Sequence, residues 1–208
     1  MAPYWSDDWG NPSSRQHRLG LTASAAVNLA RRQIANALAV TPQQLVFTSG
    51  ATEANNLALL GHARARGSGH LISVATEHHA VLDPLQQLQR EGFSVSLLTP
   101  GPDGLITPEQ LKQAITPETQ LVSVMAANNE IGVLQPLMAL AAVCRDHGVT
   151  LHSDAAQAFG HIPLEPDALG VDLMSLSAHK LYGPKGVGAL VIRDGIALQP
   201  LQWGGAQE

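Results

Sequence analysis

Short apolar runs alternate with longer amphipathic segments along the chain, and this alternation constrains its fold more than any other feature. The runs have the length of buried strands and span 45–48, 70–74, 95–98, 121–124, 149–152, 171–176 and 189–192. The amphipathic segments show the helical spacing of apolar side chains and span 15–38, 54–63, 80–91, 108–114 and 136–147. Strands that alternate with helices predict an α/β fold, with a mostly parallel sheet flanked by helices.

Polar and glycine-containing motifs follow the carboxyl ends of these predicted strands. They are TSGATEAN at 48–55, EHHAVLD at 77–83, NNEIG at 128–132, DAAQ at 154–157 and SAHKLYGPKGVG at 177–188. Open α/β sheets bind their ligands outside the carboxyl ends of the strands. The sequence therefore predicts a binding site built from these motifs.

Lys180 stands in the turn between the last two predicted strands, and we expect it to be partly buried between them. Burial lowers the pKa of a lysine amine, so that the amine becomes a nucleophile able to form a Schiff base with a carbonyl. Pyridoxal phosphate is the commonest such carbonyl. A lone lysine more often buries only its stem and keeps its amine in water. Ser177 and His179 in the same turn can donate to a phosphate, and this favours the cofactor interpretation.

Asp154 follows the predicted strand 149–152, and Gln157 comes three residues later. Pyridoxal phosphate acts as an electron sink when its ring nitrogen is protonated, and a buried aspartate is the usual partner of that nitrogen. Asp154 is the candidate for this partner, and Gln157 is a candidate donor to the ring hydroxyl. A helix N-cap explains Asp154 equally well on its own. The lysine 26 residues further on favours the cofactor interpretation.

The strand 45–48 leads through Ser49 and Gly50 into a predicted helix. A helix start presents free N–H groups and the positive end of the helix dipole, and both suit a phosphate. A capping box that begins at Thr52 is the alternative explanation of the same residues.

The composition narrows the class of protein. The net charge is −5, so a nucleic-acid partner is not expected, and no apolar run is long enough to predict a membrane span. A single cysteine excludes an internal disulfide and fits a reducing, cytoplasmic location. The nine histidines show no metal-ligand spacing with that cysteine, so no metal site is expected.

Together, and in this order along the chain, the five motifs resemble the cysteine desulfurases of the NifS/IscS type, which are class V, fold-type I pyridoxal-phosphate enzymes. The resemblance covers nearly the whole chain. It implies that residues 1–208 form the large cofactor-binding domain, with a mostly parallel sheet flanked by helices. It also implies that L-cysteine is the substrate, that the protein is a homodimer, and that an iron-sulfur scaffold or another sulfur-acceptor protein is its partner.

The resemblance assigns roles to individual residues. Lys180 and His78 are the catalytic pair: Lys180 holds the cofactor covalently and shuttles protons, and His78 lies over the pyridine ring and takes part in proton transfer. An imidazole can do both, because it gains and loses protons near neutral pH. Asn129 binds the ring hydroxyl and reaches the substrate carboxylate, although turn propensity alone also explains an asparagine there.

The phosphate of the cofactor is assigned to a second group of residues. Ala51 and Thr52, at the predicted helix start, bind it by resemblance. Ser177 and His179, beside the lysine in the last of the five motifs, can also donate to this phosphate.

Relative to the family, the chain lacks a segment before Met1 and stops at Glu208, within a motif that family members continue. We therefore expect an incomplete large domain without the C-terminal small domain, and an isolated piece that is inactive and poorly soluble. The nucleophilic cysteine of the family belongs to the missing part. Cys144 lies on a predicted amphipathic helix, where a buried structural thiol is expected instead.

The expected function is removal of sulfur from L-cysteine, which gives L-alanine and an enzyme persulfide for iron-sulfur cluster assembly or tRNA thiolation. Another class V reaction, by a selenocysteine or cystine lyase or an aminotransferase, needs the same lysine, aspartate and histidine and stays open. A binding or scaffold module without catalysis is the third possibility.

Overall fold

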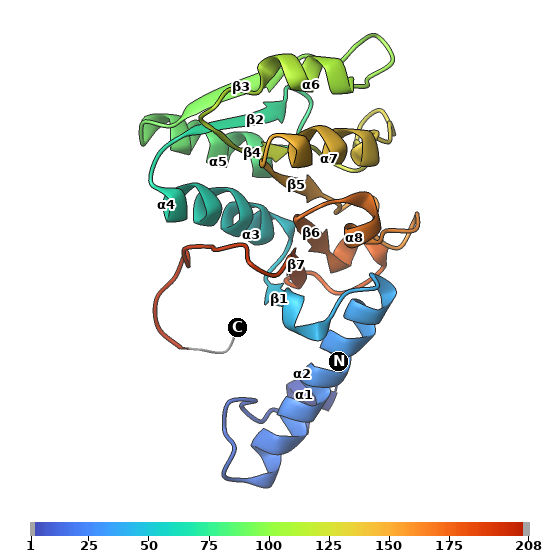
Figure 1. Ribbon diagram of the computed structural model, residues 1–208. Coiled ribbons are helices and arrows are strands. Elements are labelled where there is room, and N and C mark those ends of the chain that lie inside the picture. Colours follow the sequence, from blue (N-terminus) through green and yellow to red (C-terminus); the bar gives the residue numbers. More distant parts are fainter. Residues whose placement is uncertain (1–2, 206–208) are drawn as a thin grey trace.

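A computed structural model describes residues 3–205, and the terminal residues 1–2 and 206–208 lie outside the described part. Expectations about Met1 and about the final motif at Glu208 therefore fall outside it. The described chain forms a seven-stranded sheet in the order β1-β7-β6-β5-β4-β2-β3. Helices cover both faces of the sheet (Figure 1).

Six strands of the sheet point the same way. They are β1(Leu45–Thr48), β2(His70–Val74), β3(Ser94–Leu98), β4(Thr119–Ser123), β5(Thr150–Asp154) and β6(Leu173–Ser177). The seventh, β7(Gly188–Ile192), runs antiparallel to both of its neighbours, β1 and β6. The predicted α/β fold with a mostly parallel sheet is thus confirmed, and each predicted strand is found within three residues of its expected bounds.

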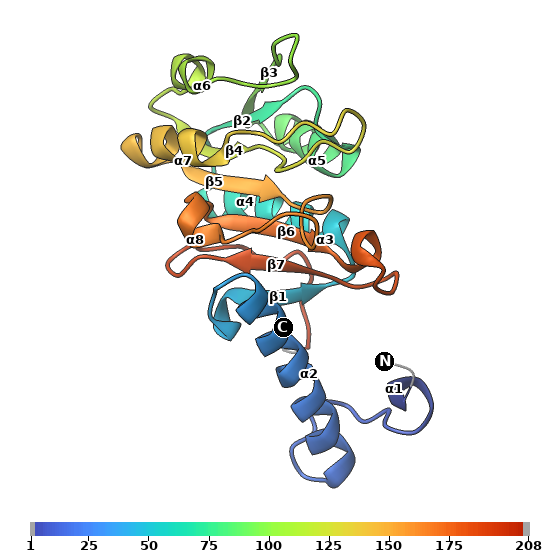
Figure 2. The same ribbon diagram turned by 90° about the vertical axis from the view of Figure 1, so that its right-hand side faces the viewer.

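The helices form two layers around the sheet (Figure 2). On one face lies a continuous helical segment, α3(Ala51–Asn56), a π-helical turn η2(Leu57–Gly61) and α4(His62–Arg66), together with α5(His79–Arg90). On the other face lie α6(Pro108–Ala114), α7(Leu137–Asp146) and α8(Pro166–Leu169). The short α8 was not predicted, because four residues are too few to show a helical period.

Two apolar cores lie on the two faces, and neighbouring residues of one strand belong to different cores. Leu71, Leu121 and Leu173 pack under α3 and α5, whereas the residues that follow them, Ile72, Val122 and Met174, pack under α6 and α7. Side chains of a strand alternate between its faces, so a strand buried on both sides is apolar throughout. This explains why the sequence shows continuous apolar runs.

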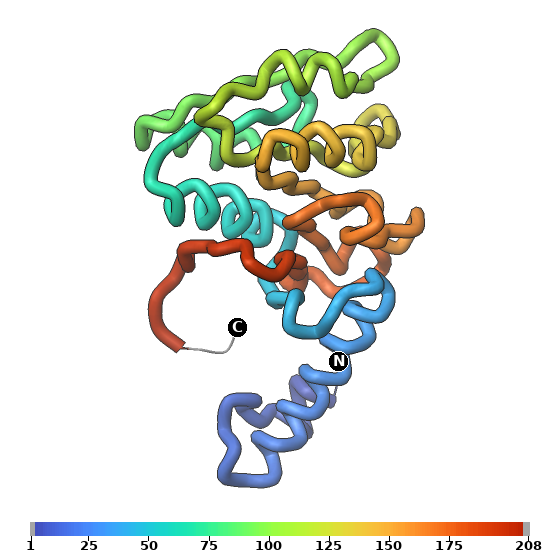
Figure 3. Tube along the Cα trace, viewed as in Figure 1, coloured from blue at the N-terminus to red at the C-terminus, as the bar shows by residue number. Residues whose placement is uncertain are grey.

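The N-terminal part forms an arm that projects away from the sheet layers (Figure 3). It comprises residues 3–37, with α1(Pro3–Ser6) and the long α2(Arg18–Ala37). The helix predicted over 15–38 begins three residues later, at Arg18, because Nδ1 of His17 accepts the Gly20 N–H at 3.2 Å and caps it. No helix among residues 3–205 is long and apolar enough to cross a membrane.

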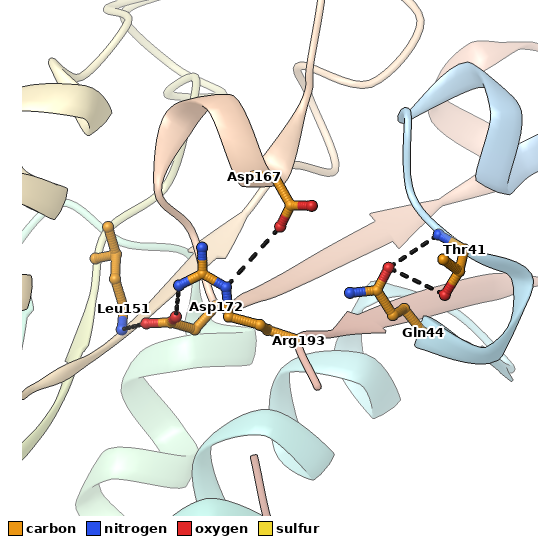
Figure 4. Close-up of polar contacts among 6 residues, drawn as sticks. All are labelled: Thr41, Gln44, Leu151, Asp167, Asp172 and Arg193. Carbon is orange, nitrogen blue, oxygen red and sulfur yellow. Dashed lines mark hydrogen bonds and ion pairs between the residues drawn. The ribbon is translucent and has the colours of Figure 1, made fainter. Parts of the chain in front are cut away.

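An ion pair ties the amino-terminal edge of the parallel strands together (Figure 4). The carboxylate of Asp172, just before β6, accepts the Leu151 N–H at 2.8 Å and a guanidinium N–H of Arg193 at 2.7 Å. It thereby links β5 to the residue that follows β7. This polar cluster lies at the end of the sheet opposite to the predicted binding motifs.

Two buried histidines connect neighbouring strands inside the sheet. The ring nitrogens of His152, on β5, lie 2.8 and 2.9 Å from the hydroxyls of Ser123 on β4 and Ser175 on β6. His70, on β2, bridges Thr119 on β4 and Ser96 on β3 in the same way. Burial lowers the pKa of both rings and so favours the neutral state, in which one nitrogen donates and the other accepts.

The neutral state of His152 predicts a pH dependence of stability. Burial, with repulsion from His62 as a smaller cause, lowers the pKa of His152 to about 3. The unfolded imidazole takes up its proton near pH 6.5, whereas the folded one stays neutral until about pH 3. The stabilisation is therefore complete above pH 6.5 and is lost as the pH falls toward 3, by about 1.4 kcal/mol per pH unit.

A His152→Gln variant should accordingly lose stability less steeply than the wild type between pH 5.5 and 4. Urea unfolding at a series of pH values measures the two slopes. His147→Gln, at an exposed position on the surface, is the matched control and should follow the wild type. Identical slopes for wild type and His152→Gln would contradict the buried neutral histidine.

Candidate active site

The predicted motifs meet in one pocket of about 460 Å³ at the carboxyl ends of the strands. A volume of this size is usual for a cofactor or small-molecule site. All nine residues singled out in the sequence line it, and they are Ala51, Thr52, His78, Asn129, Asp154, Gln157, Ser177, His179 and Lys180. The parallel direction of the strands is the reason, because it brings their carboxyl ends to the same edge of the sheet.

The turn after β1 leads into the helical segment that begins with α3, and this helix start lines one side of the pocket. The helix begins at Ala51, three residues earlier than expected, because the Gly50 carbonyl accepts the Ala54 N–H at 3.1 Å. The carboxylate of Glu53 reaches back to the Ser49 N–H at 2.7 Å. Thr52 therefore lies inside the helix and is not its cap, which leaves its hydroxyl available to the pocket.

Close backbone packing holds this turn against β7. A Cβ atom added to Gly188 would lie 2.6 Å from the Gly50 Cα and 2.6 Å from the Leu176 carbonyl oxygen. Only glycine allows the turn to approach the sheet so closely. The glycine that ends the lysine motif thus shapes the part of the pocket that the first motif lines.

Asp154 is buried at the end of β5, with 6% of its surface exposed. Its Oδ1 accepts the Ala156 N–H at 2.9 Å, and its Oδ2 accepts from Nδ2 of Asn55 at 2.7 Å. Burial raises the pKa of Asp154, and the two hydrogen bonds and the nearby His78 oppose that rise. The residues that follow Asp154 form turns instead of a helix, so the N-cap alternative is wrong. Asn55 was not singled out in the sequence.

His78 caps α5, since its Nδ1 accepts the Ala80 N–H at 3.0 Å. The proton of the neutral ring is therefore on Nε2. The neighbouring His79 faces away, and its Nδ1 lies 3.3 Å from a carboxylate oxygen of Asp83. The two adjacent histidines of the motif thus have different environments, and of the two His78 is the one that lines the pocket.

Lys180 lies on a short 3₁₀ turn, Ala178–Leu181, between β6 and β7. The expectation that it is buried between the two strands is wrong: Lys180 is exposed and lines the open pocket. The turn projects from the sheet edge, because the strands end at Ser177 and resume only at Gly188. Nε2 of His161 lies 3.1 Å from the Lys180 carbonyl oxygen and holds the backbone of the turn.

Further polar side chains complete the pocket wall. The hydroxyl of Ser177, which is buried, lies 2.9 Å from Nδ1 of His179. Asn128 shapes the next loop, because its Oδ1 accepts the N–H groups of Glu130 and Ile131. This leaves Asn129 at the pocket. Lys185 also lines the pocket, although no role was predicted for it.

Glu77 lies beneath the pocket with both oxygens buried. Its Oε1 accepts the Met125 N–H at 2.7 Å and so joins the end of β4 to the loop before α5. Its Oε2 has no hydrogen-bond partner among the described residues. Burial raises the pKa of Glu77 well above the usual value, and the nearby Asp154 adds to the rise. A protonated carboxyl is the state that this environment favours.

The donor set fits pyridoxal phosphate. Thr52, Ser177, His179 and the start of the helical segment can donate to an anionic group in the pocket that they line. Asp154 is a buried acceptor for a cationic ring nitrogen, and Lys180 supplies an amine. Cys144, by contrast, is buried on α7, and burial raises the pKa of its thiol to about 12.

Comparison with known protein families gives one match over the whole chain: the family model described as "Aminotransferase class-V" covers residues 1–208. Among curated proteins, the chain is 47% identical to the mitochondrial cysteine desulfurase of Eremothecium gossypii over 100% of this chain and 43% of that protein. It is 48% identical to the cysteine desulfurase IscS of Rickettsia felis, over 100% of this chain and 52% of that protein. The chain thus spans about half the length of the curated relatives it matches.

Solved structures are similar over almost the whole chain. A structure described as "SspA in complex with cysteine" has a TM-score of 0.95 and 42% identity, over 99% of this chain and 60% of that one. A structure described as "NIFS-LIKE PROTEIN" has a TM-score of 0.96 and 37% identity, over 100% of this chain and 57% of that one.

The environment of Glu77 predicts the effect of a Glu77→Gln substitution. Because the folded pKa is raised, the wild type loses stability as the pH rises from about 4.5, where the unfolded carboxyl ionises, through the folded pKa. Glutamine keeps the acceptor for the Met125 N–H and cannot ionise. Its free energy of unfolding should exceed that of the wild type increasingly between pH 5 and 8, by up to about 1.4 kcal/mol per pH unit. Glu130→Gln, at an exposed position, is the control, and parallel curves for Glu77→Gln and wild type would contradict a neutral Glu77.

Proposed function

The chain belongs to the class-V aminotransferase family, and we propose that it forms the pyridoxal-phosphate-binding large domain of a cysteine desulfurase. The observation that carries the proposal is the convergence of Lys180, Asp154 and His78 on one pocket from three different strand ends. These three groups supply an amine, a buried carboxylate and an imidazole. The cysteine desulfurases among the curated relatives support the choice of reaction over a lyase or an aminotransferase.

The cofactor, when bound, supplies an electron sink that stabilises negative charge on the substrate carbon attached to it. Around it, each residue has a proposed task. Asp154 keeps a positive charge on the ring nitrogen, Gln157 and Asn129 donate to the ring hydroxyl, and Asn129 also reaches the substrate carboxylate. Ala51, Thr52, Ser177 and His179 bind the phosphate. The support for these tasks is that all these residues line the same pocket.

Lys180 and His78 are the proposed proton carriers. Lys180 is exposed in a turn outside the sheet, so its amine can reach the pocket, bind the cofactor covalently and move protons at Nζ. His78 holds its proton on Nε2, because Nδ1 is occupied by the Ala80 N–H. A fixed tautomer allows one defined nitrogen to donate during the reaction.

The proposed substrate is L-cysteine, and the products are L-alanine and a persulfide on a cysteine of the whole protein. One similar structure is of SspA in complex with cysteine, and this ligand of a related protein supports the proposed substrate. Cys144 is excluded as the sulfur acceptor by its burial and its raised pKa. We propose an iron-sulfur scaffold or another sulfur-acceptor protein as the next recipient of the sulfur. Failure of a persulfide-loaded protein to transfer sulfur to any scaffold protein would contradict this step.

The proposed assembly is a homodimer. The projecting arm exposes large apolar side chains, including Trp5 at 72% and Trp9 at 70% of their surface, and also Leu19, Leu21 and Leu29. Exposed apolar side chains gathered on one segment are typical of an interface. Light scattering on the full-length protein tests the assembly, and a monomer would contradict it. For the location we propose the cytoplasm, which a fractionation experiment tests; the support is a single, buried free thiol.

Lys180→Ala should abolish covalent retention of the cofactor. After incubation of the full-length protein with pyridoxal phosphate and reduction with borohydride, mass spectrometry should find the added mass on the wild type but not on this variant. Lys185→Ala is the matched control, because Lys185 lines the same pocket. Loss of the added mass in Lys185→Ala with retention in Lys180→Ala would overturn the assignment.

The reaction itself gives a second prediction. The full-length protein should convert L-cysteine to L-alanine and release sulfide when a reducing agent is present, and His78→Ala should slow this turnover by at least about 100-fold. Analysis of the products distinguishes the alternatives: a keto acid that retains the sulfur, in place of alanine, would support an aminotransferase. A transaminating or inert full-length protein that still binds the cofactor would refute the desulfurase proposal.

A further inference from the structure

Asn55 is a fully buried polar residue in the wall behind the pocket, and nothing in the proposed reaction uses it directly. It lies on α3, with none of its surface exposed, and it does not line the pocket. Its Nδ2 donates to Oδ2 of Asp154 at 2.7 Å, a contact between residues 99 positions apart in the chain. The distance is typical of a hydrogen bond to an ionised carboxylate.

The two donors of Asp154 come from different elements and bind different oxygens. Oδ1 accepts from the Ala156 N–H in the loop after β5, and Oδ2 accepts from Asn55 on α3. Two bonds on the two oxygens fix the plane of a carboxylate, whereas one bond leaves it free to rotate. The helix that carries Thr52 at the pocket therefore also sets the orientation of the acid at the end of β5.

The chemistry of the donor matters as much as its position. An amide is uncharged, so it stabilises a buried negative charge without cancelling it. A lysine or arginine in the same place would form an ion pair with Asp154 and compete with a cationic ligand. The Oδ1 of Asn55 is buried without a hydrogen-bond partner among the described residues. A buried oxygen without a partner is destabilising, and here the nitrogen of the same amide binds the Asp154 carboxylate.

We propose that Asn55 is a positioning residue, which holds the Asp154 carboxylate ionised and oriented so that it can pair with a protonated ring nitrogen in the pocket. This inference rests on the proposed function, since it takes the ligand to be a pyridine cofactor. Asn55 acts through Asp154 and contacts neither cofactor nor substrate. Its contribution should therefore depend on the ring nitrogen of the ligand and on the presence of the Asp154 carboxylate.

The test compares two ligands: pyridoxal phosphate and its 1-carba analogue, in which a carbon replaces the ring nitrogen. Dissociation constants for both are measured by fluorescence titration on the cofactor-free full-length protein. The wild type should prefer pyridoxal phosphate, and Asn55→Leu should reduce this preference by at least about tenfold, the lower end of the range for a hydrogen bond to a charged group. Binding of the analogue should change little, because the analogue has no nitrogen for Asp154 to bind.

Matched variants distinguish a positioning role of Asn55 from a non-specific disturbance of the structure. Asn56→Leu makes the same substitution one residue further on, where the side chain donates to the Thr52 carbonyl at 2.8 Å, and it should keep the wild-type preference. In an Asp154→Asn background, Asn55→Leu should have no further effect on the ratio of the two constants. If Asn55→Leu does not fold, Asn55→Ser, which cannot overfill the site, should show the same loss of preference.

The outcomes distinguish this inference from the function on which it rests. A wild type that binds neither ligand would refute the proposed cofactor. A wild type that prefers pyridoxal phosphate, with an unchanged preference in a folded Asn55→Leu or Asn55→Ser variant, would refute the role of Asn55 alone. An equal loss of affinity for both ligands would show a structural role and would also overturn the proposal.

Discussion

A carboxylate kept inside the protein at the end of β5 is the constraint on which the rest of the pocket depends. Burial favours the neutral form of Asp154, and the structure opposes this with two fixed donors and an imidazole nearby. Each of these groups comes from a different segment of the chain. Asp154 therefore gains its two donors and the nearby imidazole only when the sheet brings β5, α3 and the loop before α5 together.

Burial also favours the neutral form of other polar groups in the core. Burial lowers the pKa of His152 and His70, whose rings bond to serine and threonine hydroxyls on neighbouring strands, and burial raises the pKa of Glu77. Neutral buried groups cost less than charged ones, provided that their hydrogen bonds are made. In the proposed site, the two donors to Asp154 keep a charge at the buried position where a cationic ligand would meet it.

The residues at the rim of the pocket are more exposed to solvent than Asp154 at its floor. Lys180 is exposed, and the turn that carries it ends in Tyr182, which is fully exposed and has a left-handed backbone with φ of 62°. A non-glycine residue in that region of conformational space is uncommon and is a feature of turns at functional sites. The buried part of the site is therefore the acid and the groups that bind it, and the exposed part is the amine.

The sequence by itself determined the α/β class and the positions of the strands, because the periodicity of apolar residues and the chemistry of turns are local properties. The motifs and their order along the chain indicated the residues that line the pocket. The sequence did not determine the exposure of Lys180, the cap at His17, or the partner of Asp154, since these depend on which segments become neighbours. Asn55 belongs to a motif visible in the sequence, yet only the packing of α3 against the end of β5 gives its amide a carboxylate to bind. Long-range contacts of this kind have no local signal, and the tertiary structure alone decides them.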